Sequence, residues 1–546
     1  MVDSNELPKP VVLMILDGWG IAPPGPGNAV TLTHTPTLNQ LWAAYPHTQL
    51  KASGEAVGLP RGEDGNSETG HVNFGAGHIV FQDLPRISLA IADASFYANP
   101  AFLAAINWAK KNQSWLHLFG LIGAGGVHAN NEHLFALLNI CQKEGLKHVA
   151  LQLFTDGRDS PPNAALTYLN QLKNQIKQTE VGQICSLMGR YYAMDRDLRW
   201  ERTEKAYRCL TEGVGHKATS PEAAVQKAYE SGKTDEFIEP TIITDQSGTP
   251  LHLVSPNDAV IFYNFRIDRP RQLTKAFILD DFETQAQKMD FDPYRDRYYK
   301  SYYNQPEALR KPFKRVKKID NLFFVTMTEY ERGLPAKTAF PPSSISIPLA
   351  RVLSENNLRQ LHLAETEKER FVTYYFNGMR EQPFPGEDWS IIPSPDVPTY
   401  DLKPEMATPK IAESLIQHIR SQTHDFILVN FANPDMVGHT GIISAGIKAC
   451  ESVDAVLAKI LPEIIQIGGI ALITADHGNV EEMIDLETGQ IDTKHSTNPV
   501  PFILAAQDRQ AWPTNLSQGI LADVAPTILK LLKIPKPPNM IGKSLI

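Results

Sequence analysis

The sequence predicts an α/β protein in which a doubly wound, mostly parallel sheet carries a second α/β domain inserted into it. Short apolar runs that end abruptly in polar residues lie near both termini, and helical patterns separate them. The middle of the chain repeats this alternation with runs of its own. Alternation of strands with helices is typical of parallel sheets, because a helix returns the chain between neighbouring strands.

The first apolar run covers residues 11–16, is partly β-branched, and ends at Asp17. A run of this kind predicts a buried strand with a carboxylate at its C-terminal end. Three similar runs lie near the other terminus, at residues 426–431, 469–475 and 500–506. Helical patterns accompany them at residues 447–461 and 522–532.

The middle of the chain contains a second set of runs that end in polar residues. They cover residues 115–122, 148–154, 183–188 and 259–265. Ligands gather at the carboxyl ends of strands in open α/β sheets. We therefore expect the polar residues that follow both sets of runs to include the functional ones.

Composition excludes several classes of protein. The chain has 546 residues, with 42% apolar and 21% charged residues, as in ordinary globular proteins. Its net charge of −9 disfavours a nucleic-acid or membrane partner. Four scattered cysteines predict free thiols in a reducing compartment. The N-terminus lacks a signal-peptide pattern, so we expect a soluble cytoplasmic protein.

Residues 282–318 are rich in Tyr, Arg and Lys and show no clear periodicity. The pattern predicts an irregular surface excursion. Interleaved aromatic and basic residues can also bind nucleic acid, but most such stretches are packed or solvated connections.

Several residues have side chains suited to a metal site. Asp435 and His439 are four residues apart, Asp476 and His477 follow a predicted strand, and His495 lies in a polar segment. With Asp17, these residues form a candidate dinuclear site, although each Asp alone is typical of a cap or turn. Oxygen and imidazole ligands without thiolate suit Mn²⁺ or Zn²⁺, and we favour Mn²⁺.

Residues 65–71 read GNSETGH, which predicts a loop framed by glycines with Ser67 at its centre. A serine near divalent ions could attack phosphorus, because metal coordination activates a weak nucleophile. The alternative is that Ser67 only caps the following turn.

Eight motifs occur in an order that spans nearly the whole chain. They are LDGWG at 16–20, GNSE at 65–68, TDGRDSPP at 155–162, GRYYAMDR at 189–196, NFRIDR at 264–269, AETEK at 364–368, NPDMVGH at 433–439 and ADHGN at 475–479. In these motifs the chain resembles the cofactor-independent phosphoglycerate mutases of the alkaline phosphatase-like superfamily. The resemblance implies a metal-binding domain of residues 1–81 and 338–546, split around a substrate domain of residues 82–337.

The resemblance also implies two divalent ions and the roles of individual residues. One ion would be held by Asp435, His439 and His495, and the other by Asp17, Ser67, Asp476 and His477. Ser67 would accept the phosphate, and Asp159, Arg266 and Lys368 would assist. The implied substrate-binding residues are His128, Arg158, Asp159, Arg190, Arg196, Arg266, Arg269 and Lys368.

The implied reaction interconverts 3-phosphoglycerate and 2-phosphoglycerate through a phosphoserine and requires no bisphosphoglycerate. We expect a monomer whose partner is this small substrate. A metal-dependent phosphatase, phosphodiesterase or sugar-phosphate mutase could share the two-ion core, but a simple hydrolase would not need the residues from 128 to 269. In a third class of protein, a scaffold, the Tyr-rich segment would serve as an interaction surface.

Overall fold

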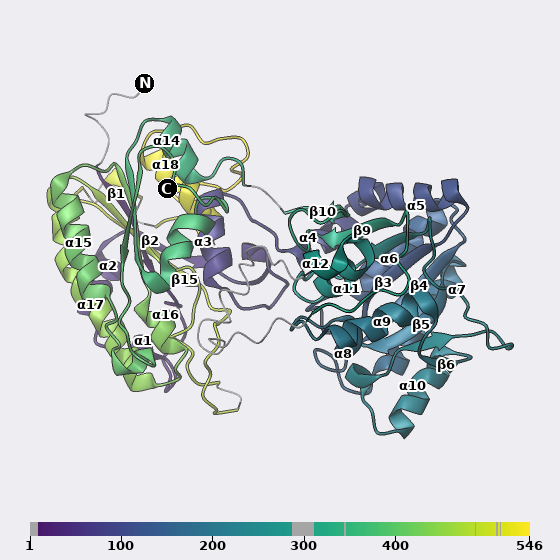
Figure 1. The fold of residues 1–546 in the computed structure, drawn as a ribbon. Helices are drawn as coiled ribbons and strands as arrows, with labels where there is room; N and C mark the ends of the chain where they lie inside the picture. The colour runs from purple at the N-terminus through teal and green to yellow at the C-terminus, as the bar shows by residue number, and fades with distance from the viewer. Residues whose placement is uncertain (1–8, 287–310, 343–344, 486–487, 509–510, 514) are drawn as a thin grey trace. The chain divides into compact units, whose positions relative to one another are not determined.

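The computed structural model describes residues 9–286, 311–342, 345–485, 488–508, 511–513 and 515–546. The chain forms two compact units (Figure 1). Unit 1 comprises residues 1–82 and 343–546, and unit 2 comprises residues 83–342. Each unit contains a sheet of eight strands within the part of the chain that the structure describes.

The sheet of unit 1 has the strand order β12-β11-β13-β1-β14-β15-β2-β16. Its strands are β1 (Val11–Leu16), β2 (His47–Lys51), β11 (Gln360–Glu365), β12 (Glu387–Ile392), β13 (Phe426–Phe431), β14 (Ile470–Thr474), β15 (Val500–Ala505) and β16 (Gly519–Ile520). All described pairings are parallel except those of β15 with β14 and β2. Every residue of β1 is buried, because this strand pairs with β13 on one side and β14 on the other.

Helices cover both faces of this sheet (Figure 1). The helices of unit 1 are α1 (Ala29–Leu32), α2 (Pro36–Ala44), α3 (Ser67–Ala76), α14 (Leu349–Glu355), α15 (Thr408–Ser421), α16 (Asn433–Gly438), α17 (Ile443–Gln466) and α18 (Val524–Leu531). Helices α15 and α17 pack side by side on one face, whereas α3, α14 and α18 lie on the other. The doubly wound arrangement expected from the sequence is therefore confirmed.

Unit 2 repeats this architecture, with the strand order β10-β9-β8-β3-β4-β5-β7-β6. Its strands are β3 (Leu116–Ile122), β4 (Val149–Thr155), β5 (Gln183–Gly189), β6 (His216–Ala218), β7 (Thr241–Ile243), β8 (Ala259–Phe262), β9 (Phe323–Thr328) and β10 (Lys337–Phe340). Its helices are α4 (Asp83–Ala92), α5 (Pro100–Asn112), α6 (Asn131–Lys143), α7 (Ala165–Thr179), α8 (Arg190–Ala193), α9 (Trp200–Glu212), α10 (Pro221–Glu230), α11 (Arg271–Ile278) and α12 (Phe282–Gln285). Among the described pairings of this sheet, only that of β7 with β5 is antiparallel.

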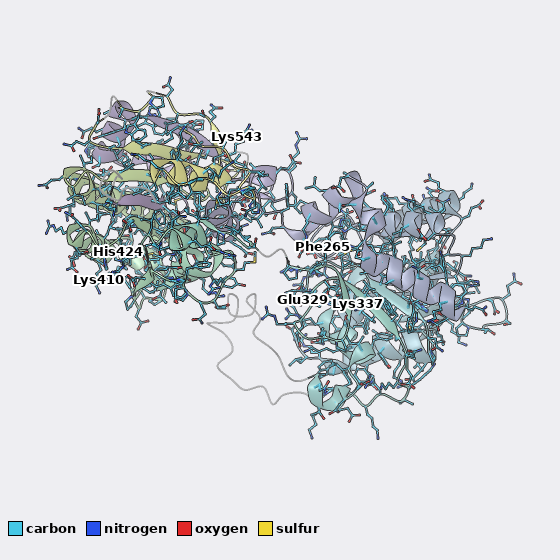
Figure 2. All side chains as sticks on the ribbon, turned by 90° about the horizontal axis from the view of Figure 1, so that it is seen from above. Phe265, Glu329, Lys337, Lys410, His424 and Lys543 are labelled. Atoms are coloured by element: carbon cyan, nitrogen blue, oxygen red, sulfur yellow. The ribbon has the colours of Figure 1, made fainter. Side chains whose placement is uncertain are left out.

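Each unit has its own apolar core. Exposed lysines such as Lys337, Lys410 and Lys543 lie outside these cores (Figure 2). The four cysteines are buried free thiols, as expected. Among the described residues, no helix combines the length and apolar character needed to cross a membrane.

The expectation of a loop at residues 65–71 is wrong from Ser67 onward. Helix α3 begins at Ser67, and the side chain of Asn66 caps it by accepting a hydrogen bond of 2.9 Å from the Thr69 amide. Gly70 is needed for close packing rather than for a turn, because a Cβ atom there would lie 2.6 Å from Cβ of Asp476. Asn66, and not Ser67, is the capping residue.

The predicted surface excursion at residues 282–318 is wrong for Phe282 and Phe313, whereas residues 311–318 are irregular and partly exposed, as predicted. Phe282 and Phe313 are buried in the core of unit 2, and their ring centroids are 5.0 Å apart. Phe282 also packs edge-on against Trp200. The remaining part of that prediction, residues 287–310, lies outside the described residues.

Candidate active site

The carboxyl ends of β1, β13 and β14 meet at one edge of the sheet in unit 1. Asp17 follows β1, Asp476 follows β14 after one intervening residue, and Asp435 lies in α16, directly after β13. Ser67 opens helix α3 and lies 3.4 Å from Asp17 through their side-chain oxygens. All four side chains are buried. The topology therefore places three carboxylates and one hydroxyl together.

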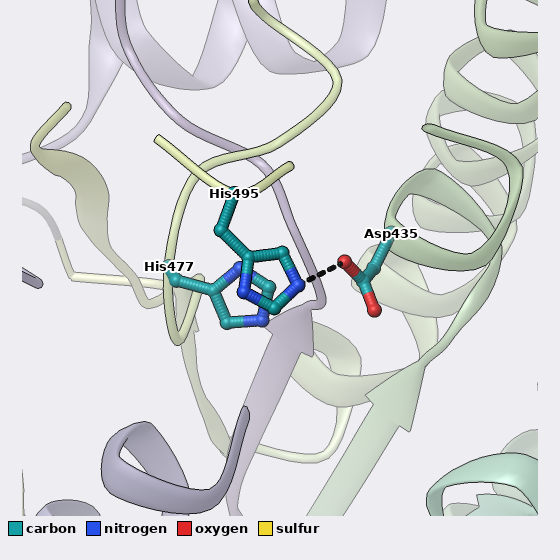
Figure 3. A group of neighbouring side chains, drawn as sticks. All are labelled: Asp435, His477 and His495. Carbon is teal, nitrogen blue, oxygen red and sulfur yellow. Dashed lines mark ion pairs between the residues drawn. The ribbon is translucent and has the colours of Figure 1, made fainter. Parts of the chain in front are cut away.

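One group of possible ligands consists of Asp435, His477 and His495 (Figure 3). Ligand atoms of these residues all lie within 4.8 Å of one another. The Nε2 atom of His495 is 3.3 Å from Oδ1 of Asp435. His439 extends the group, because its Nε2 atom is 3.3 Å from the same oxygen and 3.1 Å from Nε2 of His495.

A second group consists of Asp17, His71 and Asp476, which are all buried. Sequence reasoning assigned no role to His71. The signal was its position four residues after Ser67, since this spacing puts both side chains on one face of a helix. Nδ1 of His71 is 2.8 Å from the Ser67 carbonyl oxygen and 3.3 Å from Oδ2 of Asp476.

Asn430 was also missed, because the sequence shows it only as one residue of a buried strand. Its side-chain nitrogen lies 2.7 Å from Oδ2 of Asp17 and 3.1 Å from Nε2 of His71. If the amide donates both hydrogens, then Nε2 of His71 is the acceptor and Nδ1 carries the proton. Asn430 thereby orients a carboxylate and an imidazole at once.

The electrostatics of these groups suit a divalent cation. Burial, and then the charge of Asp476, raise the pKa of Asp17 to about 7, although Lys368 opposes this shift. Burial would also raise the pKa of Asp435, but Lys368 and His439 hold it well below its usual value. In the part of the chain that the structure describes, buried Oδ2 of Asp476 accepts no hydrogen bond of good geometry, although Nδ1 of His71 lies 3.3 Å from it. Buried carboxylates with imidazoles and no thiolate match the ligand preference of Mn²⁺ or Zn²⁺.

Lys368 lies among these carboxylates, whereas the resemblance grouped it with the substrate arginines. Its Nζ atom is 2.6 Å from Oδ1 of Asp17, 2.6 Å from Oδ2 of Asp435 and 2.8 Å from Oγ of Ser67. Burial disfavours its charge, but Asp17 and Asp435 raise the pKa of Lys368 above its usual value. A buried ammonium ion therefore contacts the candidate nucleophile.

The other candidate substrate residues lie in unit 2, beyond the carboxyl ends of its parallel strands. They are His128, Arg158, Asp159, Arg190, Arg196, Arg266 and Arg269. They follow β3, β4, β5 and β8, which are neighbours in the sheet. This is the edge at which α/β sheets gather their ligands.

Arg190 forms the buried centre of this cluster. Its Nη1 atom is 2.6 Å from Oδ1 of Asp156 and 2.5 Å from Oδ2 of Asp159. Asp156 also accepts hydrogen bonds from the amides of Arg158 and Asp159 and from the hydroxyl of Ser160. Sequence reasoning quoted Asp156 within a motif but gave it no role. Asp156 therefore shapes the turn that carries two predicted site residues, Arg158 and Asp159.

Asp268 is a second missed carboxylate, although it too lies within a quoted motif. It lies 2.7 Å from Nη1 of Arg196, 3.4 Å from Nε of Arg266 and 3.7 Å from Nδ1 of His128. Burial, and then the charge of Arg190, lower the pKa of His128 to about 3. His128 is therefore neutral at physiological pH.

Arg158 and Arg269 complete the cluster. The side chain of Arg158 is 55% exposed and lies 3.8 Å from the carboxylate of Glu236. Arg269 donates a hydrogen bond of 3.1 Å to the carbonyl oxygen of Met194. Burial, and then Arg190, lower the pKa of Arg269 to about 10. Crowding of guanidinium groups in this way favours an anionic ligand.

Comparisons with known proteins agree with this architecture. A family model described as the N-terminus of BPG-independent PGAM matches residues 87–332. A 2,3-bisphosphoglycerate-independent phosphoglycerate mutase of Chloroflexus aggregans is 52% identical over 99% of both chains. The 2,3-bisphosphoglycerate-independent phosphoglycerate mutase 1 of Methanosarcina barkeri is 47% identical over 100% of both chains.

A solved structure shows the same relationship. The phosphoglycerate mutase of Leishmania mexicana, determined at low cobalt concentration, is 28% identical to this chain, with a TM-score of 0.57. The match covers 99% of this chain and 98% of the other. Fold and relatives together define the class of protein as an α/β isomerase. The chain belongs to the family of 2,3-bisphosphoglycerate-independent phosphoglycerate mutases.

Proposed function

We propose that this enzyme interconverts 3-phosphoglycerate and 2-phosphoglycerate through a phosphoserine at Ser67. The observation that carries the proposal is the environment of the Ser67 hydroxyl, which lies 2.8 Å from Nζ of Lys368 and 3.0 Å from Nε2 of His477. Ser67 also stands in the first turn of α3, where backbone amides and the helix dipole favour a phosphate.

Two divalent ions, for which we propose Mn²⁺, would be held by the residues of unit 1. Asp435, His439 and His495 would hold one, and Asp17, Ser67, Asp476 and His477 the other. When bound, such ions lower the pKa of the serine hydroxyl and neutralise charge on phosphoryl oxygens. Two observations support a metal centre at these residues: Asp435 clusters with His477 and His495, and Nε2 of His477 also lies 3.5 Å from carboxylate oxygens of Asp17 and Asp476.

In the first transfer, Oγ of Ser67, ionised before the attack, forms a bond to the phosphorus of 3-phosphoglycerate, and the bond between phosphorus and the oxygen on carbon 3 breaks. Lys368 stabilises negative charge at the serine and the phosphoryl group. Asp159 gives a proton to the departing oxygen of glycerate. The products of this step are phosphoserine and bound glycerate.

In the second transfer, Asp159 takes a proton from the hydroxyl on carbon 2 of glycerate. That oxygen bonds to phosphorus, and the bond to Oγ of Ser67 breaks. The planar guanidinium group of arginine can donate two parallel hydrogen bonds to a carboxylate or phosphate, so the unit 2 cluster would bind the anionic groups of the substrate. The substrate-binding residues in this proposal are Arg158, Arg190, Arg196, Arg266 and Arg269, with His128.

An enolase-coupled assay with 3-phosphoglycerate and no added bisphosphoglycerate tests the proposal. The protein is first treated with a chelator and then given Mn²⁺. We expect turnover to disappear on chelation and to return with Mn²⁺. Absence of turnover after Mn²⁺ is restored would contradict the proposed function, and release of inorganic phosphate without 2-phosphoglycerate would identify a phosphatase instead.

A further inference from the structure

Glu481 is a buried acid of unit 1 that is neither a proposed metal ligand nor a proposed catalytic residue, and it is 2% exposed. Oε2 of Glu481 accepts hydrogen bonds of 2.9 Å from the Gly20 amide and 2.8 Å from the Asn479 amide. Oε1 accepts one from the Ser496 hydroxyl and one of 3.1 Å from the Asn498 side chain. One carboxylate therefore accepts four hydrogen bonds.

These donors belong to three loops, and each loop carries candidate metal ligands. Gly20 is three residues after Asp17, Asn479 is two residues after His477, and Ser496 directly follows His495. A shift of the carboxylate would therefore displace residues of both proposed ion sites. Distances between a metal ion and its ligands vary by only about 0.2 Å, so even a small displacement of the ligand residues would weaken the affinity of the site for the ion.

The surrounding glycines show that the three loops close tightly around this carboxylate. A Cβ atom at Gly20 or at Gly478 would collide with the carboxyl group of Glu481. The loops also contact one another directly, because the Ser496 amide donates a hydrogen bond of 3.0 Å to the Gly478 carbonyl oxygen. The loops thus have little freedom to rearrange around a different side chain.

We propose that Glu481 is a positioning residue of the metal centre, whose buried carboxylate fixes the three loops that present Asp17, His477 and His495. This inference rests on the proposed function, since it concerns the same ions. Glu481 itself is not a proposed ligand. It acts through backbone amides and Ser496, in the way that outer-shell hydrogen bonds orient metal ligands in other proteins.

The test measures Mn²⁺ binding to chelator-treated protein, without substrate, by titration calorimetry. Glu481→Ala removes all four acceptor contacts, and we expect the dissociation constant to rise about tenfold to 100-fold, as for other outer-shell substitutions. Ser496→Ala removes one donor and should give a smaller rise. Glu482→Gln is the matched control, because Glu482 accepts a 2.8 Å hydrogen bond from Asn498 and is next in the chain.

A second readout separates positioning from a purely structural role. The melting temperature of the chelated protein reports the fold alone, whereas its increase on adding Mn²⁺ reports the ligands. We expect Glu481→Gln to keep the melting temperature of the chelated protein and to reduce its increase on adding Mn²⁺. If Glu481→Ala does not fold, Glu481→Gln is the variant that tests the inference.

The outcomes distinguish this inference from the proposed function. If the wild-type protein binds Mn²⁺ and both Glu481→Gln and Ser496→Ala bind it equally well, the inference is overturned and the proposed function stands. A loss of stability in the chelated state with unchanged Mn²⁺ affinity would also overturn it. A wild-type protein that binds no Mn²⁺ would overturn both.

Discussion

The ammonium nitrogen of Lys368 lies 2.8 Å from the hydroxyl oxygen of Ser67, in the buried interior of unit 1. The same nitrogen contacts Asp17 and Asp435 at 2.6 Å each. Lys368 therefore links the candidate nucleophile to carboxylates of both proposed ion sites.

Replacing Lys368 with Met should remove charge stabilisation at the serine while leaving an apolar chain of similar length. We expect kcat to fall by about 100-fold or more, the cost of losing one preorganised donor at a reacting centre. The measurement is the coupled assay at saturating Mn²⁺. Lys410→Met removes an exposed lysine of the same unit and should leave kcat unchanged. A Lys368→Met enzyme with wild-type kcat would exclude this role.

Ser67→Ala should abolish both turnover and phosphorylation of the protein, because no other hydroxyl group of the protein takes part in the proposed transfer. Mass spectrometry of protein mixed with 3-phosphoglycerate checks for the phosphoserine peptide, and circular dichroism checks the fold. Ser53→Ala, which changes another serine of unit 1, should keep both activities. Appreciable turnover by Ser67→Ala would show that Ser67 is not the nucleophile.

Asp159→Asn should block proton exchange with glycerate without affecting metal binding, because Asp159 lies in unit 2 and the proposed ligands lie in unit 1. We expect kcat to fall by about 100-fold to 10,000-fold, the usual contribution of general acid–base catalysis. Calorimetric titration with Mn²⁺ should give the wild-type affinity. The exposed Asp320 is a suitable control position in the same unit. Unchanged turnover would exclude Asp159 as the acid and base.

His128 should make the stability of unit 2 sensitive to acid. Burial, and then Arg190, lower its pKa from 6.5 to about 3, so the unfolded chain binds this proton more readily than the folded unit. The resulting stability is present above pH 6.5 and is lost as pH falls towards 3, with a slope of about 1.4 kcal/mol per pH unit. The unfolding free energy of His128→Gln, measured with urea, should fall less steeply between pH 7 and about pH 4 than that of the wild-type protein.

The exposed His148 provides the matched control for that experiment. His148→Gln controls for the replacement of a histidine by glutamine in the same unit. Equal slopes for wild type and His128→Gln would contradict the prediction, because they would show that folding does not change the affinity of His128 for a proton.

Much of the fold could be predicted because buried strands have a local signature. The apolar runs at residues 11–16, 426–431 and 469–475 contain β1, β13 and β14, and the polar residues after them lie at one edge of the sheet. The direction of β15 could not be predicted, since an apolar run looks the same in either direction. The helix at Ser67 was missed because Gly70 resembles a loop residue, although it serves close contact with Asp476.

By itself, the sequence determined the α/β class, the family resemblance and the candidate residues, because these depend on residue type, order and spacing. Tertiary structure decided which of these residues meet. It placed Lys368 between Asp17 and Asp435, His71 beside Asp476, and Asn430 beside Asp17. It also brought backbone amides and a hydroxyl of three loops to the carboxylate of Glu481. The contacts of Lys368 and Asn430 with Asp17, and of Gly20 with Glu481, join residues hundreds of positions apart, and only the pairing of strands brings them within hydrogen-bond distance.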